Sequence, residues 1–253
     1  MLTLRDLQRR HSVRNYSETP LKGSLLNTLK AVVTDINSHE AGLNFQLITD
    51  DPAPFKGFMK SYGFFSGVNN YLAAVIDPAF DHAEERAGYC AEQFVMKAVK
   101  LGLGTCFVGG TFSRKDCSVQ IRVYEKIPFV VTVGYPAEKV GLVSALAERM
   151  IHRNSKKPRD FFSGTAEQYE MLRREYDWFE PAIQAVALAP SALNKQPVRI
   201  GCIETGGKLK LAAYAINSSQ YSDVELGIAK YNFGAIAPGF WEWGQSAQFV
   251  TEE

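Results

Sequence analysis

The spacing of apolar residues along the chain predicts both helices and strands. Leucine, valine and isoleucine recur every three or four residues over Leu21–Ile36, which is the pattern of an amphipathic helix. A longer helix is expected over residues 81–101, because this stretch is rich in Ala, Glu and Lys and stops at Gly102, a frequent C-terminal stop. Thr3 and Asp6 have the spacing of a capping box, so a short helix is expected to end near residue 10.

Short apolar runs between turn residues predict the strands, which lie at residues 43–49, 71–76, 127–133 and 198–204. Further helices are expected over residues 166–188, 208–215 and 222–237. Ser222 is the expected N-cap of the last helix, and Gly206-Gly207 is expected to open a turn. Strands and helices are mixed without a strict βαβ rhythm, which favours an α+β fold.

A short pattern occurs in both halves of the chain. The residues Gly88-Tyr-Cys-Ala-Glu-Gln-Phe94 can be laid over Gly227-Ile-Ala-Lys-Tyr-Asn-Phe233, and each lies on the main predicted helix of its half. The two glycines, the two amides and the two phenylalanines match. Three similar positions can arise by chance, so this repeat gains weight only if other features also indicate duplication.

Composition narrows the class of protein. The chain has 253 residues, of which 46% are hydrophobic and 22% charged, so it suits one large globular domain or two smaller ones. Its net charge of +1, from 28 basic and 27 acidic residues, argues against nucleic-acid or membrane-surface binding. Without a signal-like N-terminus, a long apolar run or paired cysteines, we expect a cytoplasmic protein with buried or half-buried free thiols.

Near the N-terminus, the phrase Arg9-Arg10-His11-Ser12-Val13-Arg14-Asn15-Tyr16 follows the first predicted helix. In an extended segment, residues two apart point the same way, so Arg10, Ser12 and Arg14 can face one ligand. Guanidinium groups offer a rigid fork of donors that suits a phosphate or the polar edge of a ring. The alternative is a solvated basic patch, and His11 is expected to point away from any ligand.

Three other phrases carry candidate chemistry. Ala189-Pro-Ser-Ala-Leu-Asn-Lys-Gln-Pro197 lies between a helix and a strand, where it could also be only a helix stop and a turn. The glycine-rich residues 101–110 follow a helix rather than a strand, which is the wrong order for a dinucleotide-binding loop. Gly134-Tyr-Pro136 precedes a basic segment that contains Arg153, Lys156 and Lys157, which could also be a solvated linker.

Together these phrases resemble the nitroreductase family of FMN-dependent oxidoreductases. The resemblance implies the FMN-dependent nitroreductase α+β fold, with a central antiparallel or mixed sheet and flanking helices. It implies that Arg10 and Ser12 hold the FMN phosphate and ribityl side, while Arg14 lies near the pyrimidine edge of the ring. A fixed cation there would stabilise the negative charge of reduced flavin. Arg14 is therefore expected to give electrostatic support, and no side chain is expected to act as a catalytic acid or base.

The resemblance also implies the rest of the cofactor site. Backbone groups of Gly109 and Gly110 are expected near flavin N5, where glycine lets the main chain come close to a flat ring. The basic segment is expected to reach the phosphate through Lys156 or Lys157, with Arg153 as a spare. Contacts from the second half are expected from the loop residues Pro190, Ser191, Ala192 and Asn194, with Gln196 supporting the loop. Val198 departs from the family, in which an aromatic residue is common at this place.

In common members of the family, the two main phrases lie a few dozen residues apart and act across a homodimer interface. Here they lie almost a chain length apart, which predicts a single-chain pseudo-dimer that acts as a monomer. We expect one half at residues 1–160 and a degenerate half at residues 161–253, packed as one intertwined unit. The reciprocal phrases are missing, because Thr34–Gly42 stands where the second APSxxNxQP loop would be. We therefore expect one FMN between the halves.

The implied activity is a ping-pong reduction of a small nitroaromatic- or quinone-like acceptor by NADH or NADPH, with hydride passing through flavin N5. One alternative is an FMN-binding or flavin-handling protein with little or no turnover. Another is a structural relative with an empty cleft. The acceptor and the choice of nicotinamide stay open, since Trp241, Trp243 and Tyr62–Phe65 could each line a pocket or fill the core.

Overall fold

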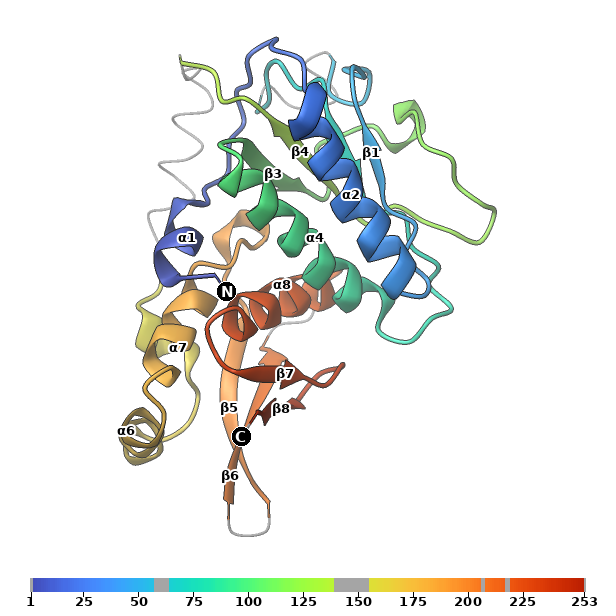
Figure 1. Cartoon of the computed structure of the whole chain (residues 1–253). Coiled ribbons are helices and arrows are strands. Elements are labelled where there is room, and N and C mark those ends of the chain that lie inside the picture. Colours follow the sequence, from blue (N-terminus) through green and yellow to red (C-terminus); the bar gives the residue numbers. More distant parts are fainter. Residues whose placement is uncertain (1, 57–63, 139–154, 206–207, 217–218, 253) are drawn as a thin grey trace. The chain divides into compact units, whose positions relative to one another are not determined.

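The same succession of elements occurs twice along the chain (Figure 1). The computed structural model describes residues 2–56, 64–138, 155–205, 208–216 and 219–252. The first succession is α2 (Gly23–His39), β1 (Gln46–Ile48), β2 (Tyr71–Ala73), α4 (Ala83–Lys100), β3 (Gly104–Val108) and β4 (Val130–Gly134). The second is α7 (Phe179–Ala187), β5 (Val198–Thr205), β6 (Lys208–Ala215), α8 (Ser222–Gly234), β7 (Gly239–Trp241) and β8 (Ala247–Thr251). Outside them lie α1 (Leu4–Arg9), α6 (Ala166–Glu175) and the short 3₁₀ turns η1 (Arg114–Asp116), η2 (Pro158–Phe161) and η3 (Ala192–Asn194).

Each succession forms a four-stranded sheet with the same topology. The strand order is β1-β2-β4-β3 in the first sheet and β5-β6-β8-β7 in the second, and all pairs are antiparallel. In both sheets the main helix, α4 or α8, connects the second strand to the third along the chain. This repeated topology confirms the predicted α+β fold and its internal duplication.

One hydrogen bond fixes the correspondence between the halves before the first strand of each sheet. The Asp77 N–H donates to the Gly42 carbonyl at 2.8 Å, and the Ile216 N–H donates to the Pro197 carbonyl at 3.0 Å. Gly42 therefore corresponds to Pro197, and the loop at residues 189–197 corresponds to residues 34–42. Residues 34–39 belong to helix α2, so the first half is helical over most of the stretch that is a loop in the second half.

Contacts between residues divide the chain into two units that interleave in sequence. The C-terminal unit comprises residues 1–8, 84–92 and 154–253, and the N-terminal unit comprises residues 9–83 and 93–153. Each unit contains one of the sheets and its own buried cluster of apolar side chains. The predicted halves at residues 1–160 and 161–253 stay a prediction. None of the helices in the described ranges is long and apolar enough to cross a membrane.

Aromatic rings form the centre of the core in the C-terminal unit. The rings of Phe233, Trp241 and Phe249 lie with their centroids 5.0 Å apart in each pair, and Trp178 packs against this group. Edge-on and tilted contacts of this kind stabilise beyond the area that they bury. Trp241 and Phe249 lie on the last two strands and Phe233 lies on α8, so these rings join the end of the chain to that helix.

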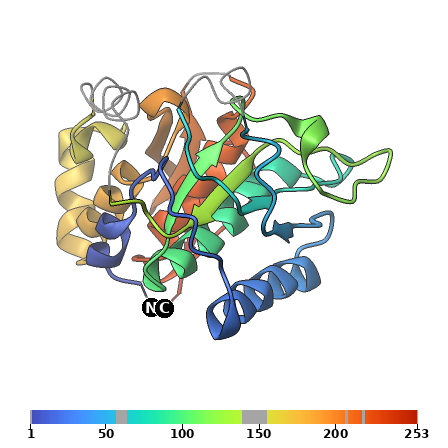
Figure 2. The same cartoon turned by 90° about the horizontal axis from the view of Figure 1, so that it is seen from above.

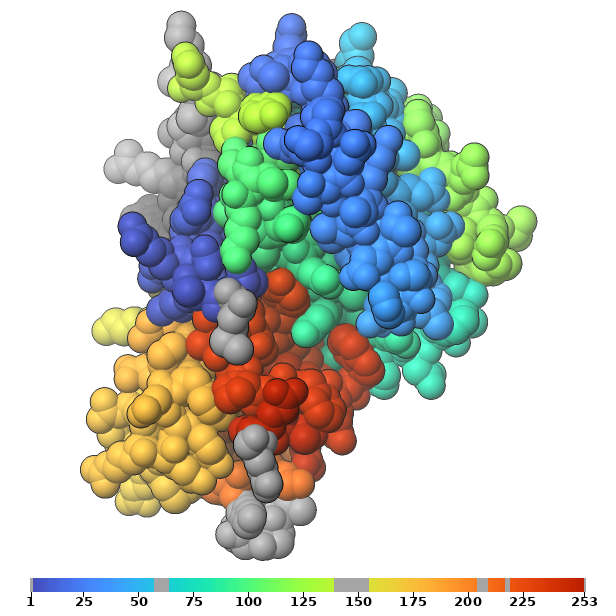
Figure 3. All heavy atoms as spheres, in the orientation of Figure 1, coloured from blue at the N-terminus to red at the C-terminus, as the bar shows by residue number. Residues whose placement is uncertain are grey.

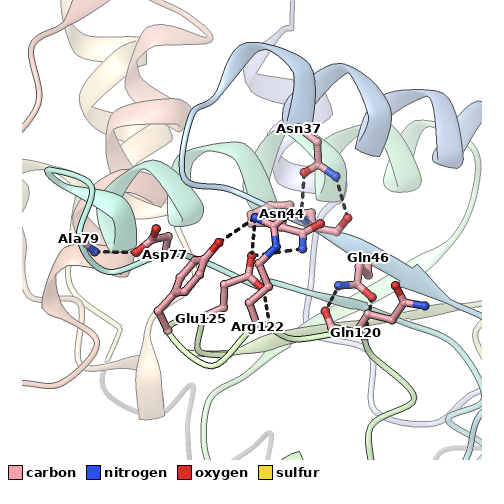
Figure 4. A network of polar contacts seen from close by, with 10 residues as sticks. Asn37, Asn44, Gln46, Asp77, Ala79, Gln120, Arg122 and Glu125 are labelled. Carbon is pink, nitrogen blue, oxygen red and sulfur yellow. Dashed lines mark hydrogen bonds and ion pairs between the residues drawn. The ribbon is translucent and has the colours of Figure 1, made fainter.

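In the N-terminal unit, α2 turns Leu29, Val33 and Ile36 inward, and its other side lies at the surface (Figure 3). The segment between β3 and β4 projects from the unit (Figure 2). Side-chain amides fasten this segment to β1, since Gln46 exchanges hydrogen bonds with the backbone of Gln120 (Figure 4). This long connection, which includes the short turn η1, is thereby tied to the sheet.

The predicted end of the long helix is confirmed. After α4, the Gly102 N–H donates to the Val99 carbonyl and the Leu103 N–H donates to the Ala98 carbonyl, both at 3.0 Å. Gly102 has a φ of 81°, which a glycine adopts without the steric cost that a side chain would bring. This pair of bonds is the Schellman motif. The capping box at the N-terminus is also confirmed, because the Asp6 N–H donates to Thr3 Oγ1 and the Thr3 N–H donates to Asp6 Oδ2.

Three expectations in the second half need correction, and two of its strands were missed. Residues 208–215 form strand β6 rather than a helix, because their pairing with β5 overrides local helix preference. Residues 166–188 form two helices, since Pro181 lacks an N–H and is tolerated only in the first turn of a new helix. Strands β7 and β8 were not predicted. Tyr221 is the N-cap of α8, while the Ser222 hydroxyl accepts a bond from Ser219. The predicted turn at residues 206–207 lies outside the described residues.

The repeated glycines mark where α4 and α8 cross. A Cβ atom on Gly88 would lie 2.1 Å from the Val224 carbonyl oxygen, and one on Gly227 would lie 1.9 Å from the Glu85 carbonyl oxygen. Each glycine therefore contacts the backbone three residues before its counterpart. This reciprocity is what a two-fold duplication produces, so the repeat of residues 88–94 at 227–233 has a physical cause.

We expect Gly227→Ala and Gly88→Ala each to lower the free energy of unfolding by about 2–3 kcal/mol, because a methyl group would overlap backbone that cannot rotate away. Gly234→Ala is the matched control on α8, since a Cβ there meets nothing within 4 Å. This control should stabilise the protein by about 0.5–1 kcal/mol, the usual gain of alanine over glycine in a helix. Urea unfolding measures all three, and equal stabilities for Gly227→Ala and Gly234→Ala would contradict the close crossing.

Candidate functional site

In the N-terminal unit, the Ser12–Tyr16 segment is extended and bonded along both edges of its backbone. On one edge, the Val13 N–H donates to the Thr105 carbonyl of β3 at 2.9 Å. On the other, Ser66 donates to the Arg14 carbonyl and accepts from the Tyr16 N–H, both at 3.0 Å. The backbone is thus fixed like a strand inside a sheet, although the sequence contains no long strand here.

The Tyr16 ring locks this segment onto the sheet. Its hydroxyl contacts both the Val13 carbonyl and Thr132 Oγ1 at 2.7 Å, and burial holds the pKa of Tyr16 well above its usual value. The Gly134-Tyr-Pro136 turn joins the same place, because the Ser17 N–H donates to the Tyr135 carbonyl. The structure therefore brings two of the predicted phrases together.

The side chains of the segment alternate as predicted. Val13 and Asn15 are buried, whereas Ser12 and Arg14 are half-buried and Arg14 Nη1 reaches back to the Ser12 carbonyl at 3.4 Å. Arg10 is also half-buried. His11 is exposed, and its ring contacts the Arg9 carbonyl. That His11 points away from a ligand stays a prediction.

Gly109 and Gly110 follow directly after β3, the strand that pairs with Ser12. Neither glycine is among those with positive φ, so their backbone angles do not require glycine. The Gly109 carbonyl accepts a hydrogen bond from Arg114 Nη2 at 2.7 Å.

In the C-terminal unit, Gln196 holds the Ala189–Pro197 loop together. Its N–H donates to Ser191 Oγ at 2.9 Å, its side-chain oxygen accepts from the Lys156 N–H, and its carbonyl accepts from Lys156 Nζ at 2.7 Å. These bonds agree with the supporting role expected of Gln196. They also bring the predicted basic segment onto the predicted flavin loop, where Asn194 Nδ2 donates to Ser155 Oγ at 3.1 Å.

The loop has an unusual backbone. Leu193, Asn194 and Gln196 have φ angles of 53°, 53° and 50°, in the left-handed region that favours glycine. Each such residue costs on the order of 1–3 kcal/mol, and surroundings that keep several of them in one loop are typical of binding sites. The Leu193 side chain is 74% exposed although it is apolar. Nothing in the sequence distinguishes Leu193 from an ordinary loop residue, because its conformation depends on the bonds around it.

Glu225 anchors the same loop and was not predicted. It lies in the first turn of α8, is 5% exposed, and accepts a hydrogen bond from the Ala192 N–H at 2.6 Å. Burial raises the pKa of Glu225, and the Ala192 bond opposes that rise. Its place in the first turn of a helix suits the helix dipole and gives no sign of this contact, because the loop partner is 33 residues away in the sequence.

The structure separates the two candidate lysines. Lys156 Nζ donates to the carbonyls of Lys195 and Gln196, and burial lowers its pKa. The Lys157 side chain is exposed at the start of η2. Lys156 therefore has a structural task within the loop, whereas Lys157 is the better candidate for an anion. Arg153 lies outside the described residues.

The predicted site residues thus form two groups. Arg10, Ser12, Arg14, Gly109 and Gly110 belong to the N-terminal unit. The C-terminal unit contains the others, namely Lys156, Lys157, Pro190, Ser191, Ala192 and Asn194. Each group is assembled within its own unit, and that both contact one flavin stays a prediction.

Two of the aromatic residues suggested for the acceptor pocket belong to the cores of the units. Trp241 is 6% exposed and belongs to the core of the C-terminal unit, and Phe65 packs against the core of the N-terminal unit. Trp243 is half-buried, with its ring 5.5 Å from that of Tyr89 and the Arg86 guanidinium 5.7 Å from its centroid. Tyr62 lies outside the described residues. Val198, where relatives often have an aromatic residue, is buried.

Comparisons with known proteins agree with this architecture. Among solved structures, the chain is similar to a "putative nitroreductase" from Thermotoga maritima, with 20% identity, a TM-score of 0.59, and 98% of this chain and 92% of that chain covered. At this identity the similarity shows the fold alone. A search of curated protein sequences found no match.

Two further structures are similar to about half of the chain. An FMN-dependent nitroreductase from Clostridium difficile has 16% identity and a TM-score of 0.43, with 53% of this chain and 88% of that chain covered. A nitroreductase with bound FMN from Bacteroides fragilis has 17% identity and a TM-score of 0.41, with 55% and 90% covered. These TM-scores are too low to support a structural argument.

The fold therefore defines the class as a duplicated α+β nitroreductase fold. The family follows from the sequence, because residues 3–237 match the family described as "Putative TM nitroreductase". The chain belongs to this family.

Glu225 gives a test of the loop anchor. Because its folded pKa is raised, the ionised carboxylate costs stability above that pKa, and the cost disappears as pH falls and the group takes up a proton. Glu225→Gln keeps an acceptor for the Ala192 N–H, so we expect it to be roughly 1 kcal/mol more stable than the unaltered chain at pH 7.5. The difference should shrink at pH 4.5. Urea unfolding at both pH values measures it, with exposed Glu18→Gln as the control that should show no such trend.

Proposed function

We propose that this protein is an FMN-dependent oxidoreductase that uses NADH or NADPH to reduce a small nitroaromatic- or quinone-like acceptor in a ping-pong reaction. The observation that carries the proposal is that a chain of the nitroreductase family contains the predicted flavin-binding phrases with their backbones already fixed. FMN, when bound, supplies the chemistry of accepting and donating a hydride. The chain's own residues bind it, orient it and stabilise its charge.

The donors present suit such a cofactor. Arg10 and Ser12 would hold the phosphate and ribityl side, and exposed Lys157 would add a cation for the phosphate. Arg14 would lie near the pyrimidine edge, where its charge favours the reduced ring. The Ser191 hydroxyl accepts a bond from the Gln196 N–H, so its own proton is still available to a ligand. Pro190, Ala192 and Asn194 would contribute loop contacts from the C-terminal unit.

The two halves differ at one equivalent backbone amide, which supports a single flavin per chain. In the first sheet, Val130 of β4 pairs with Ala73 of β2 on one side and with Val108 of β3 on the other. In the second sheet, Gln248 of β8 pairs with Ala212 of β6 on one side, and on the other side its carbonyl accepts a hydrogen bond from the Glu242 N–H after β7. Val108 thus corresponds to Glu242, and Gly110, two residues further on, corresponds to Gly244.

At Gly244 this position is closed by charged side chains. The Gly244 N–H donates to Glu85 Oε2 at 2.7 Å, and its carbonyl accepts from Lys230 Nζ at 2.9 Å. Lys230 is fully buried and also pairs with Glu85, so this ion pair would be costly to open. By contrast, the Gly110 N–H makes no hydrogen bond with the residues in the described ranges. A flavin is therefore expected at the Gly110 turn and not at the Gly244 turn.

A second candidate function is an FMN-binding or flavin-handling protein with little turnover, because family and fold alone do not establish catalysis. A third is a structural protein that binds no flavin. For each, we propose a monomer, since one chain contains both sheets of the duplicated fold.

Purified protein reconstituted with FMN separates these functions. We expect about one FMN per chain from the flavin and protein absorbance, and loss of the yellow colour when NADH or NADPH is added without oxygen. Yellow protein that keeps its colour would favour the flavin-handling function, and failure to bind FMN would favour the structural one. Two FMN per chain would contradict the closed Gly244 turn.

We expect Arg14 to stabilise the negative charge of reduced flavin more than it contributes to the affinity for FMN. We expect Arg14→Gln to slow flavin reduction by NAD(P)H about 100-fold, a typical effect of losing one charge-stabilising donor, while FMN affinity falls by less than tenfold. Stopped-flow absorbance gives the rate and fluorescence titration gives the affinity. Arg5→Gln, an exposed cation on α1, is the control and should change neither. A larger loss of affinity than of rate would assign Arg14 to binding instead.

A further inference from the structure

Arg114 makes a set of contacts that the proposed function does not yet use. Its side chain donates from Nη2 to the Gly109 carbonyl at 2.7 Å and to the Pro128 carbonyl at 3.0 Å, and from Nε to the Ile127 carbonyl at 2.9 Å. Its guanidinium carbon also lies 4.7 Å from the centroid of the Phe112 ring. One planar group therefore joins the turn after β3 to the residues that lead into β4.

These contacts determine the direction of one peptide plane. The described part of the chain contains no cis peptide bond, so the Gly109 carbonyl and the Gly110 N–H point in opposite directions within the plane of the peptide that they share. With the carbonyl held by Arg114, the N–H must point away from Arg114. Glycines on both sides of this peptide would otherwise let it rotate easily, because neither has a side chain to restrict it.

In the equivalent turn of the other half, at Gly244, the backbone groups form hydrogen bonds with side chains of the chain itself. There, the Gly244 N–H is occupied by the Glu85 carboxylate and the Gly244 carbonyl by Lys230. At the Gly110 turn, a cation holds the preceding carbonyl instead, and no carboxylate among the described residues accepts from the amide. The two turns thus differ in whether the N–H is satisfied within the chain.

We propose that Arg114 is a positioning residue that orients and polarises the Gly109–Gly110 peptide, so that the Gly110 N–H donates to a ligand acceptor, flavin N5. This inference rests on the proposed function for the identity of the ligand. A cation bonded to the carbonyl draws electron density from the amide and makes its N–H a stronger donor. Arg114 itself is exposed and bonded to the chain, so it acts through the peptide and not on the cofactor directly.

The first test uses the protein without flavin. We expect Arg114→Gln to move the ¹H–¹⁵N resonance of Gly110, because the peptide loses both its anchor and the cation that polarises it. Arg114→Lys keeps the charge but not the planar fork of donors, so it should give an intermediate change. Arg122→Gln, on the same projecting segment, should leave the Gly110 resonance unchanged, since Arg122 Nη1 bonds to the Tyr124 hydroxyl instead.

The second test uses the FMN-loaded protein. We expect Arg114→Gln to shift the ¹⁵N5 resonance of labelled FMN and to slow flavin reduction about tenfold, with FMN affinity within about threefold of the unaltered chain. If the unaltered protein binds FMN and is reduced, but Arg114→Gln leaves both the Gly110 and the N5 resonances in place, Arg114 has no positioning role. If the unaltered protein binds no FMN, the proposed function fails while the peptide orientation is still judged by the first test.

Discussion

The close crossing of α4 and α8 is the constraint on which the duplicated fold depends. Gly88 and Gly227 bring two helix backbones together so closely that neither position has space for a methyl group. Because the two backbones are in direct contact, the glycines fix where the helices cross and how they are aligned along their axes. No flexible side chain lies between them that could adjust to a shift. Around it lie the buried Lys230–Glu85 pair and the aromatic group under α8. The Lys230–Glu85 pair joins the two helices, so it needs them at that separation.

Much of the fold could be predicted from local pattern. The periodicity over Leu21–Ile36 and the stop at Gly102 identified α2 and the end of α4. Both features depend on residues that are close in the sequence, so a local pattern is enough to predict them. Strand β6 could not be recognised in the same way, since residues 208–215 become a strand through pairing with β5. The break before α7 did carry a local signal, in Pro181, which periodicity alone overlooked.

In the candidate site, too, the residues that depend on local sequence were predicted and those that depend on distant contacts were not. Motifs recognised as contiguous phrases, such as the segment around Ser12 and the loop around Ser191, were found because relatives use them in that form. Residues that act through distant partners were missed. Glu225 bonds to Ala192, and Arg114 bonds to the backbone of Gly109 and Pro128, and neither partnership leaves a pattern in the sequence. Supporting residues of this kind become visible only when the backbone is known.

Fusion of the two halves into one chain removes a restriction that governs symmetric dimers. In a homodimer every substitution occurs twice, so a buried lysine near the two-fold axis would bring a second buried lysine with it. Here Lys230 and Glu85 correspond to Ala91 and Val224, so the buried charges are present in one copy only. A chain built in this way can specialise each half separately, with one keeping a ligand-binding edge while its former twin becomes a scaffold.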